Sequence, residues 1–328
     1  MLNLNTISIL FFSILFFISC VSDKQWITMK DGKMTVNLLP PNGEYVNDTL
    51  SCDETEMTNI DYREYLYWVS KVYGENSETL KKALPDSLVA FTFFSELNTD
   101  RDSIFKKYFE MRINYLRHPS YDNYPLIGIT YQQALDYSKW RSDRVFEMML
   151  IEKKLIQVHT QIDSLNHFTI ERYLAGQYFN YAPSKKVPIP RFRLPTIEEW
   201  EMIAKMNGGD EWGIDFNRKE VKKHQKEDLT LFLTRDDIIN RNDFIKNEKS
   251  NFYNLIPYTT PVRNFLQYKN SPCNLIGNVA EMTNTEGIAK GGSWYHTKEE
   301  SKIKNNINYD KQKAWLGFRN VCIWEIPK

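Results

Sequence analysis

Apolar and polar residues alternate with the period of an α-helix between residues 58 and 73. Aromatic and aliphatic side chains recur there every three or four positions, and Thr58 stands where its hydroxyl can cap the first turn. This spacing predicts an amphipathic helix. Its inward face would carry Tyr62, Tyr65, Leu66, Val69 and Val72.

Two further helices are predicted by capping boxes, in which a Thr hydroxyl and a Gln or Glu side chain three residues later satisfy exposed helix-start amides. The first box joins Thr130 to Gln133, and its helix can continue toward His159. The second joins Thr196 to Glu199 and opens a shorter helix. The inward residues of these two helices would be Ala134, Tyr137, Trp140, Trp200, Ile203 and Ala204.

Elsewhere the apolar runs are short and irregular. Residues 124–129 predict a strand, and residues 321–326 form another apolar run near the C-terminus. Residues 218–249 mix many charges of both signs, which is typical of a solvated insertion. No repeat of fixed period is visible, so the pattern gives no support to solenoids or propellers.

The N-terminus carries an apolar run at residues 7–18, which is shorter than the roughly 20 residues that cross a bilayer. Ser19-Cys20 follows at once, as in a bacterial lipoprotein signal. We expect residues 1–19 to be removed, Cys20 to carry lipid and residues 20–48 to form a tether and lead-in. Val21 after the Cys favours the outer membrane of a cell envelope. The alternative is an ordinary cleaved signal in which Cys20 occurs by chance.

Composition excludes several classes of protein. The chain has 328 residues, of which 42% are hydrophobic and 26% charged, so it is not disordered as a whole. Lys+Arg 42 and Asp+Glu 42 cancel, which argues against a nucleic-acid partner bound through a broad basic surface. Gly is scarce, at 13 residues, which leaves little material for glycine-rich phosphate loops.

Cysteine usage fits an exported protein with at most one disulfide. Apart from Cys20, the chain has Cys52, Cys273 and Cys322. A Cys52–Cys322 bridge is weakly favoured because both residues lie in strand-like runs at opposite ends of the domain. Buried free thiols are an equal alternative.

Seven motifs, taken together and in order, resemble the formylglycine-generating enzyme (sulfatase-modifying factor) family. They are DETEMTN (53–59) with YREY (62–65), YPLIGI (124–129), ALDYSKW (134–140), RLPTIEEW (193–200), GNVAE (277–281), GGSW (291–294) and GFR (317–319). The resemblance implies a compact, irregular α+β fold related to C-type lectins over residues 49–328. A helical insertion at 142–190 and the Cys20 signal are similar to a lipoprotein branch of gliding-motility and type IX secretion systems.

The resemblance also implies what is missing. Family oxidases bind copper through a pair of cysteines shortly after the Gly-Gly-Ser-aromatic turn, and His296 and Ser301 occupy those positions here. Neither can supply a thiolate, so copper and formylglycine generation are not expected. Family enzymes of the animal type bridge a helix Cys to a Cys after Gly-Phe-Arg, and Ser138 and Asn320 stand at those places. Iron-dependent relatives use clustered His ligands, for which this sequence offers no motif.

A calcium site is the one piece of family chemistry that the resemblance leaves open. Its ligands would be the Asn274 side chain, the Gly277 and Val279 carbonyls and the Glu281 carboxylate, all oxygen donors suited to a hard cation. In the alternative, Glu281 only accepts hydrogen bonds from loop amides, without a metal. Arg319 and Glu199 are expected as ion partners, and Gly291 and Gly292 as a tight turn with positive φ.

The sequence therefore predicts a membrane-anchored, non-catalytic protein with a structural or interaction role in an envelope machine. Its partners would be the membrane, through Cys20, and other envelope proteins. Two alternatives stay open: a metal-dependent oxidase of the same family, and a calcium-assisted module that binds glycans or peptides.

Overall fold

The computed structural model describes residues 27–30, 33–36, 38–89, 115–206, 208–209, 211–215, 217–226, 234, 259–263 and 271–327. The signal segment 1–19, Cys20 and most of the charged segment 218–249 lie outside the described residues. Within the described ranges, no helix combines the length and the apolar character needed to cross a membrane.

The three helices predicted from the sequence are confirmed. They are α2 (Asn59–Tyr73), α6 (Tyr131–Glu152) and α8 (Ile197–Ala204), and each begins with a capping box at the expected Thr. Helix α6 ends at Glu152, short of His159, because the chain turns at Lys154, whose φ is 57°. Shorter helices are α3 (Glu78–Ala83), η1 (Pro119–Tyr121), α7 (Ile170–Leu174) and α9 (Lys219–Lys226).

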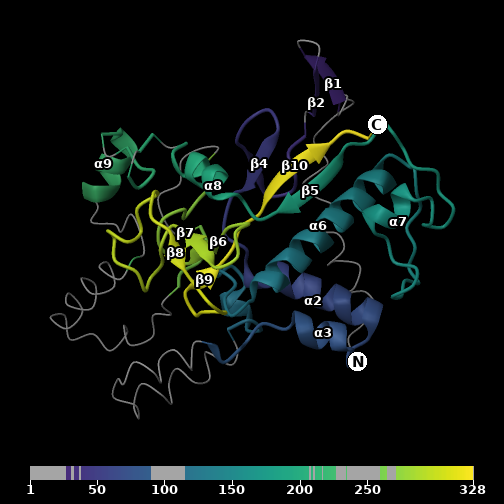
Figure 1. The fold of residues 1–328 in the computed structure, drawn as a ribbon, viewed down its shortest axis with the longest axis horizontal. Helices are drawn as coiled ribbons and strands as arrows, with labels where there is room; N and C mark the ends of the chain where they lie inside the picture. Colours follow the sequence, from purple (N-terminus) through teal and green to yellow (C-terminus); the bar gives the residue numbers. More distant parts are fainter. Residues whose placement is uncertain are drawn as a thin grey trace.

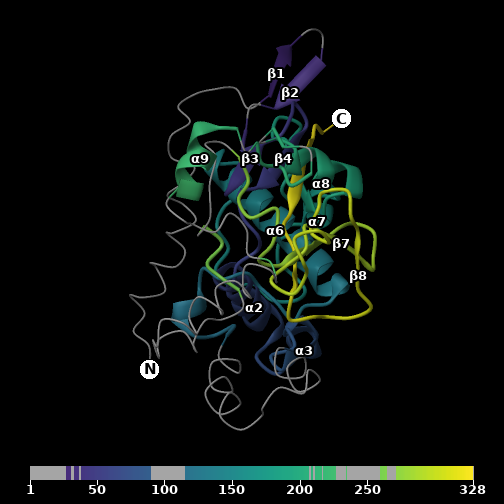
Figure 2. The same ribbon diagram turned by 90° about the vertical axis from the view of Figure 1, so that its left-hand side faces the viewer.

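The strands form small sheets around these helices (Figure 1). One sheet has the order β3 (Gly43–Tyr45), β4 (Leu50–Asp53), β10 (Val321–Glu325) and β5 (Ile189–Arg193), and all its pairs are antiparallel. A second has the order β8 (Ile307–Asn308), β7 (Ile288–Lys290), β6 (Ala280–Met282) and β9 (Leu316–Gly317). Strands β1 (Ile27–Lys30) and β2 (Lys33–Val36) form a hairpin that extends beyond the rest of the molecule in both views (Figure 2).

The predicted strand at residues 124–129 is not formed. That segment makes a single isolated bridge, between Pro125 and Thr58, and its apolar side chains Leu126 and Ile129 are buried in the cluster that also holds residues of α2, α6 and β6. Its backbone hydrogen bonds go to different segments: the Leu126 amide donates to the Met57 carbonyl at 2.7 Å, and the Gly128 carbonyl accepts from the Asp86 amide at 2.7 Å. The apolar run was therefore a core segment of irregular backbone, which periodicity cannot distinguish from a short strand.

The Cys52–Cys322 disulfide is also wrong. Strands β4 and β10 are adjacent, but Cys52 lies opposite Val321, and Cys322 lies opposite Ser51. Successive side chains of a strand point to opposite faces, so the two thiols lie on opposite sides of the sheet. Cys52, Cys273 and Cys322 are all buried free thiols.

Three apolar clusters hold the fold together. The largest surrounds α2 and the first half of α6, where the rings of Tyr62 and Tyr137 stack with centroids 5.6 Å apart. A second joins β4 and β10 to α8 through Cys52, Val321 and Trp200. The third belongs to residues 142–190. This segment begins as the second half of α6, includes α7, ends at the start of β5 and otherwise has irregular backbone. Its core holds Phe146, Phe168, Tyr173 and Tyr178.

Candidate functional site

A buried ion pair lies at the centre of the motif-bearing segments. Arg319 precedes β10 and Glu281 lies on β6, and both side chains are 0% exposed. The Arg319 guanidinium donates from Nη2 to Glu281 Oε1 at 2.6 Å and from Nε to both carboxylate oxygens at 2.8 Å. Trp200 of α8 donates from Nε1 to Glu281 Oε2 at 2.7 Å. The expected role of Arg319 as a buried ion partner is thus confirmed.

The same guanidinium also ties distant parts of the chain together. Arg319 Nη1 donates to the Asp53 carbonyl at 3.0 Å, and Nη2 donates to the Cys273 carbonyl at 2.6 Å. The carboxylate of Glu281 raises the pKa of Arg319 further above its ordinary value, although burial acts in the opposite direction. A charge buried this deeply is tolerated only because every donor has an acceptor. The pair therefore acts as a clamp between β4, β6 and β10.

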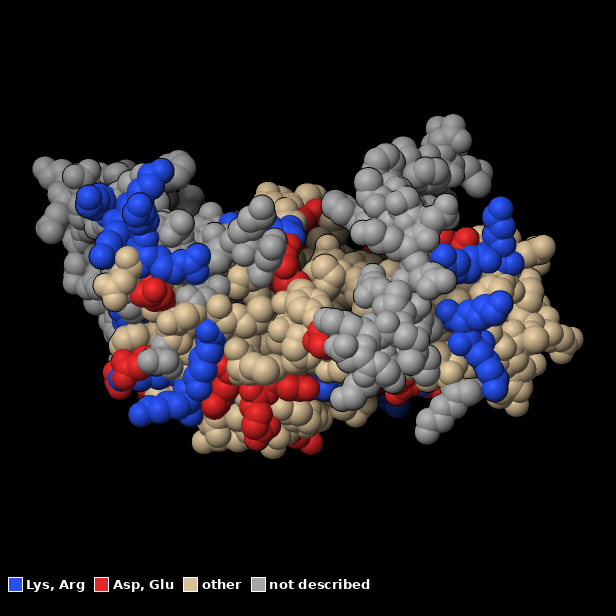
Figure 3. Space-filling view, turned by 90° about the horizontal axis from the view of Figure 1, so that it is seen from above, with Lys and Arg blue, Asp and Glu red and all other residues tan. Residues whose placement is uncertain are grey.

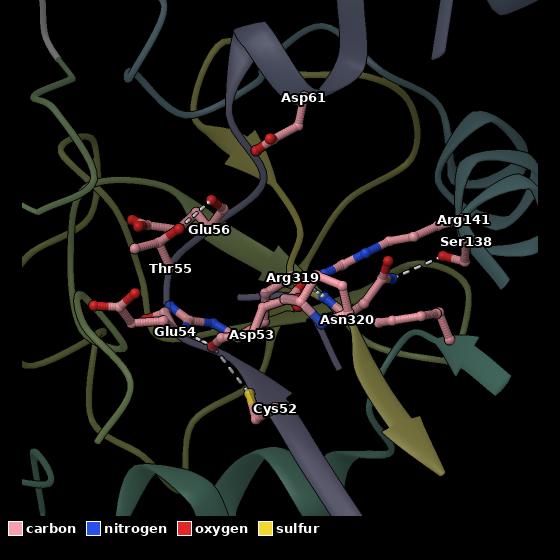
Figure 4. A network of polar contacts seen from close by, with 12 residues as sticks. Cys52, Asp53, Glu54, Thr55, Glu56, Asp61, Ser138, Arg141, Arg319 and Asn320 are labelled. Atoms are coloured by element: carbon pink, nitrogen blue, oxygen red, sulfur yellow. Dashed lines mark hydrogen bonds and ion pairs between the residues drawn. The ribbon is translucent and has the colours of Figure 1, made fainter. Parts of the chain in front are cut away.

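Asp53 forms a second ion pair next to the clamp, with Arg141 of α6, at 2.7 Å (Figure 4). The same carboxylate oxygen, Oδ2, accepts from the Asn320 amide at 2.9 Å. Arg141 also donates to the Pro41 carbonyl at 2.9 Å, and its guanidinium lies over the Phe192 ring, 4.1 Å from the centroid. Because Asn320 follows Arg319 directly, the two ion pairs form one continuous polar network.

Glu56 is a third acid in this interior, and it is 1% exposed. Asn278 donates from Nδ2 to Glu56 Oε1 at 2.9 Å, and Asn274 donates from Nδ2 to Oε2 at 3.3 Å. Burial raises the pKa of the Glu56 carboxyl to about 8, although Arg319 acts to lower it. The Glu56 carboxyl therefore keeps its proton to a higher pH than an exposed glutamate does. In the sequence, Glu56 is one letter of the motif at 53–59, and no neighbouring residue indicates that it is buried.

The predicted calcium ligands lie close to this network. Asn274, with φ 51°, donates from Nδ2 to the Val262 carbonyl at 2.8 Å, and its Oδ1 is buried without a hydrogen-bond partner. Gly277 donates its amide to the Gly291 carbonyl at 2.9 Å, and Val279 is buried. The unpaired Asn274 oxygen fits a cation, whereas Glu281 would have to share its oxygens with Arg319. Calcium binding stays a prediction.

Across the residues that the structure describes, no three His, Cys, Asp or Glu side chains converge as in a metal centre. A calcium site of the predicted kind would therefore depend mainly on neutral amide and carbonyl oxygens. Such a site binds weakly, because affinity rises with the number of charged ligands.

The residues at the family's copper positions are packed into the fold. The His296 and Trp315 rings make a T-shaped contact, with centroids 4.7 Å apart and an interplanar angle of 87°, and His296 Nδ1 lies 2.7 Å from Ser293 Oγ. Ser301 is buried, and its hydroxyl donates to the Thr297 carbonyl at 2.8 Å. At Gly292, with φ 65°, an added Cβ would lie 1.9 Å from Ser301 Oγ. The predicted positive-φ turn at Gly291 and Gly292 is confirmed.

The thiols of the described chain are far from nucleophilic. Burial raises the pKa of the Cys273 and Cys322 thiols to about 12, and it raises the pKa of Cys52 still further. Cys322 packs in the cluster of the insertion, and Cys52 packs in the cluster beneath α8. A thiolate is the form that attacks or binds a soft metal, so these residues contribute packing.

A small cleft lies between α6, α7 and β5, and it has a volume of about 190 Å³. Several of its charged lining residues form ion pairs: Lys139 contacts Glu171 at 2.8 Å, and Arg193 contacts Glu199 at 2.7 Å. Asp143 accepts from the Ile170 amide at 2.8 Å, and burial raises its pKa to about 6. No local sequence pattern indicates this cleft, because it is assembled from residues about thirty to fifty positions apart.

Comparison with known proteins identifies the family. A family model described as "Sulfatase-modifying factor enzyme 1-like domain" matches residues 22–325. The chain belongs to this family. Its mixed helices and sheets form the fold of formylglycine-generating-enzyme-like proteins, as the resemblance implied.

The solved structures that match this family member have low sequence identity to it. Treponema denticola variable protein 1 is 14% identical, with a TM-score of 0.39, over 90% of this chain and 98% of that one. CarF is 14% identical, with a TM-score of 0.37, over 86% of this chain and 96% of CarF. PvdO from Pseudomonas aeruginosa is 13% identical, with a TM-score of 0.34, over 62% of this chain and 63% of PvdO. No curated protein matches by sequence.

Proposed function

We propose that this family member is a lipid-anchored, non-catalytic protein that serves as a structural and interaction component of an envelope machine. Gliding motility or type IX secretion is the machine that the narrower sequence resemblance favours. One observation carries the proposal: the two positions that hold copper in family oxidases carry His296 and Ser301, both packed into the interior.

The chemistry at these positions supports a structural role. Copper(I) in such a centre depends on soft thiolate ligands, which an imidazole and a hydroxyl cannot replace. His296 contacts Trp315 and the Ser293 hydroxyl, while Ser301 fills the space above Gly292. These contacts are those of core residues, and they leave the oxidation chemistry of the family without its ligands.

The charged interior supports the same proposal. Glu281 and Arg319 are completely buried and hydrogen-bonded to each other, to Trp200 and to backbone carbonyls. An acid or base needs access to its substrate, and a group buried at 0% exposure has none in this conformation. The network is suited to fixing irregular backbone segments, which then present their loops to a partner.

The anchor rests on the sequence at Cys20, which lies outside the described residues. Two or more acyl chains on one residue give stable membrane attachment, where one chain binds only reversibly. An anchored domain is confined to the membrane surface, so its folded part can contact membrane-bound partners at high local concentration. Replacing Cys20 in Cys20→Ser would release the protein into the soluble fraction, whereas full membrane retention of that variant would contradict the anchor.

The experiment that tests the proposal is complementation of a gene deletion. We expect the deletion strain to lose protein secretion or surface movement, wild type to restore it, and His296→Gln to restore it equally, since no imidazole chemistry is needed. Chemical crosslinking in the same cells identifies what co-purifies. Unchanged secretion and movement in the deletion strain would refute the envelope-machine role.

Metal analysis of the purified full chain separates this proposal from the enzyme alternative. We expect neither copper nor iron at a stoichiometric amount. Stoichiometric copper or iron that is lost in His296→Gln, together with failed complementation by that variant, would favour a metal-dependent oxidase instead.

A further inference from the structure

Residues 142–190 expose apolar side chains to an unusual degree. Among the described residues, the two most exposed large apolar side chains are Leu165, at 83%, and Val158, at 63%, and both belong to this segment. Phe179, at 45%, and Leu155 are exposed as well. The same segment has its own buried cluster, and these exposed side chains are not part of it.

Two of these exposed residues, Val158 and Phe179, border the half-buried rings of His159 and Tyr181: Val158 precedes His159 in the chain, and Phe179 stacks on it. We call these four residues the insertion tip. The rings of His159 and Phe179 stack flat, with centroids 3.7 Å apart and an interplanar angle of 3°. Tyr181 accepts from the Gln157 amide at 3.2 Å and thereby joins the two loops. The tip is therefore a defined platform, built from loops twenty residues apart in sequence.

The turn that carries Phe179 is strained. Tyr181 donates its amide to the Tyr178 carbonyl at 3.0 Å, and the two residues between them, Phe179 and Asn180, have φ values of 45° and 57°. Gly and Asn are preferred in such turns, and a bulky aromatic residue is disfavoured at positive φ. Tyr178 is buried against Phe168 and fixes the base of the turn. A strained turn that holds an aromatic ring in an exposed position indicates that the ring has a function.

Exposed lysines flank the tip. Lys153 and Lys154 directly precede Leu155, and Lys185 and Lys186 follow Tyr181. Between residues 152 and 186 the exposed carboxylates are Glu152, Asp163 and Glu171, and Glu171 is paired with Lys139 at 2.8 Å, so the exposed lysines still outnumber the exposed acids. Figure 3 shows Lys and Arg side chains gathered at the end of the molecule on the right, where Figure 1 places α7.

We propose that the insertion tip binds the surface of an anionic phospholipid membrane, with Val158 and Phe179 in the headgroup region and the lysines against the lipid phosphates. Exposed aliphatic and aromatic side chains bordered by lysines have the chemistry of an interfacial membrane contact. Each lysine near an anionic surface strengthens the partition about fivefold. The proposal rests on the membrane location proposed above, and it assigns a second contact besides Cys20.

The test places an environment-sensitive dye at the tip. Full-length chain carrying Cys20→Ser and Val158→Cys is labelled with a nitrobenzoxadiazole maleimide; the other thiols are buried and do not react in the native state. We expect several-fold brighter, blue-shifted emission with vesicles of phosphatidylglycerol and phosphatidylcholine, and a much smaller change with phosphatidylcholine alone. A dye at Lys222→Cys in α9, at the opposite end of the molecule in Figure 1, should not respond.

Matched variants separate the contributions of charge and ring. Replacing the four tip-flanking lysines by Gln should abolish the phosphatidylglycerol response, whereas Gln at Lys219, Lys222, Lys223 and Lys226 of α9 should leave it unchanged. Phe179→Asn suits positive φ, so it should keep the fold while weakening the response. An unresponsive dye at position 158, equal responses at 158 and 222, or insensitivity to the tip lysines would each overturn the proposal.

The outcome is independent of the lipid anchor, because Cys20→Ser is present in every sample. Release of unlabelled Cys20→Ser from cell membranes tests the anchor alone. A silent dye together with a crosslinked protein partner at the tip would mean that a protein, and not lipid, covers this surface, and would equally reject the proposal.

Discussion

Asn320 donates a hydrogen bond from Nδ2 to Ser138 Oγ at 2.7 Å, in the buried space between α6 and β10. These are the two positions that form a disulfide in animal-type members of the family, according to the motif resemblance. The Ser138 hydroxyl in turn donates to the Ala134 carbonyl at 2.7 Å. A polar contact thus joins the same elements that a covalent bridge joins elsewhere.

The first prediction restores the bridge. Ser138→Cys with Asn320→Cys should form a disulfide on oxidation, because the side chains already contact each other. The bridge would close a loop between residues separated by 182 positions, and we expect it to stabilise the fold by about 2–4 kcal/mol. Thermal unfolding with and without reductant measures the gain. Each single variant is the control, and an oxidised double variant that unfolds at the same temperature as its reduced form would contradict the expectation.

A second prediction concerns the clamp between Arg319 and Glu281. Arg319→Leu should destabilise the protein by about 3–5 kcal/mol, because Glu281 would keep a buried charge without its partner. Combining it with Glu281→Leu should recover part of this loss. Recovery is incomplete, since the carbonyls of Asp53 and Cys273 also lose their donor. Denaturant unfolding of the single and double variants measures the coupling.

The control is the exposed pair of Lys81 and Glu78, which are 61% and 77% exposed. Lys81→Leu should change stability by less than about 1 kcal/mol. Equal losses at the buried and exposed pairs would show that Arg319 does not organise the core.

The helices of this fold were accessible from sequence because their signals are local. A capping box spans four residues, and the predicted boxes at Thr130 and Thr196 are formed in the structure. Thr58 caps its helix as predicted, and Asp61 completes a box there that was not predicted. Helical periodicity likewise identified Tyr62 and Val69 as inward-facing. The prediction of a strand at 124–129 was wrong, because an apolar run indicates that a segment is buried but not which backbone groups pair with it.

The candidate site was accessible only in part. Arg319 was recognised as an ion partner through its motif, but its pairing with Glu281 depends on contact between residues 38 positions apart. Glu56 gave no signal, since its raised pKa comes from burial by distant segments. The disulfide prediction failed through register: a shift of one residue moved Cys322 to the opposite face of the sheet from Cys52.

A third prediction is that the native thiols are inert. In the Cys20→Ser chain, Cys52, Cys273 and Cys322 should react with an aromatic disulfide reagent only after unfolding, because burial raises their pKa values and blocks access. Absorbance of the released thiolate counts the reactive groups. Rapid reaction of any of the three in the native protein would contradict both their burial and the absence of a thiol centre from the proposed function.

A fourth prediction follows from Glu56. Its pKa in the folded protein is about 8, above its unfolded value near 4.5, so the folded state holds a proton that the unfolded state releases. Stability should therefore fall as pH rises between these two values, by up to about 1.4 kcal/mol per pH unit, and level off above pH 8. Glu56→Gln should flatten this dependence and be more stable than wild type at pH 9. The exposed Glu75→Gln is the control, and an unchanged pH profile in Glu56→Gln would reject the assignment.

The last prediction tests calcium. The buried Oδ1 of Asn274 lacks a partner, so an ion bound there would gain an oxygen ligand at no loss of a hydrogen bond. Because Glu281 is shared with Arg319, we expect weak, millimolar affinity; calcium at ten times the dissociation constant would then stabilise the fold by about 1.4 kcal/mol. Melting temperatures in calcium, magnesium and chelator measure this increment.

Asn274→Ala is the informative variant for that measurement. It removes the side-chain oxygen while the Glu281–Arg319 pair stays intact, so it should melt equally in calcium and in chelator. Glu281→Ala is unsuitable, because it unbalances a buried charge and should destabilise the protein with or without the ion. If wild type shows no calcium increment, or if Asn274→Ala retains it in full, the unpaired oxygen does not bind calcium and Glu281 serves only the internal clamp.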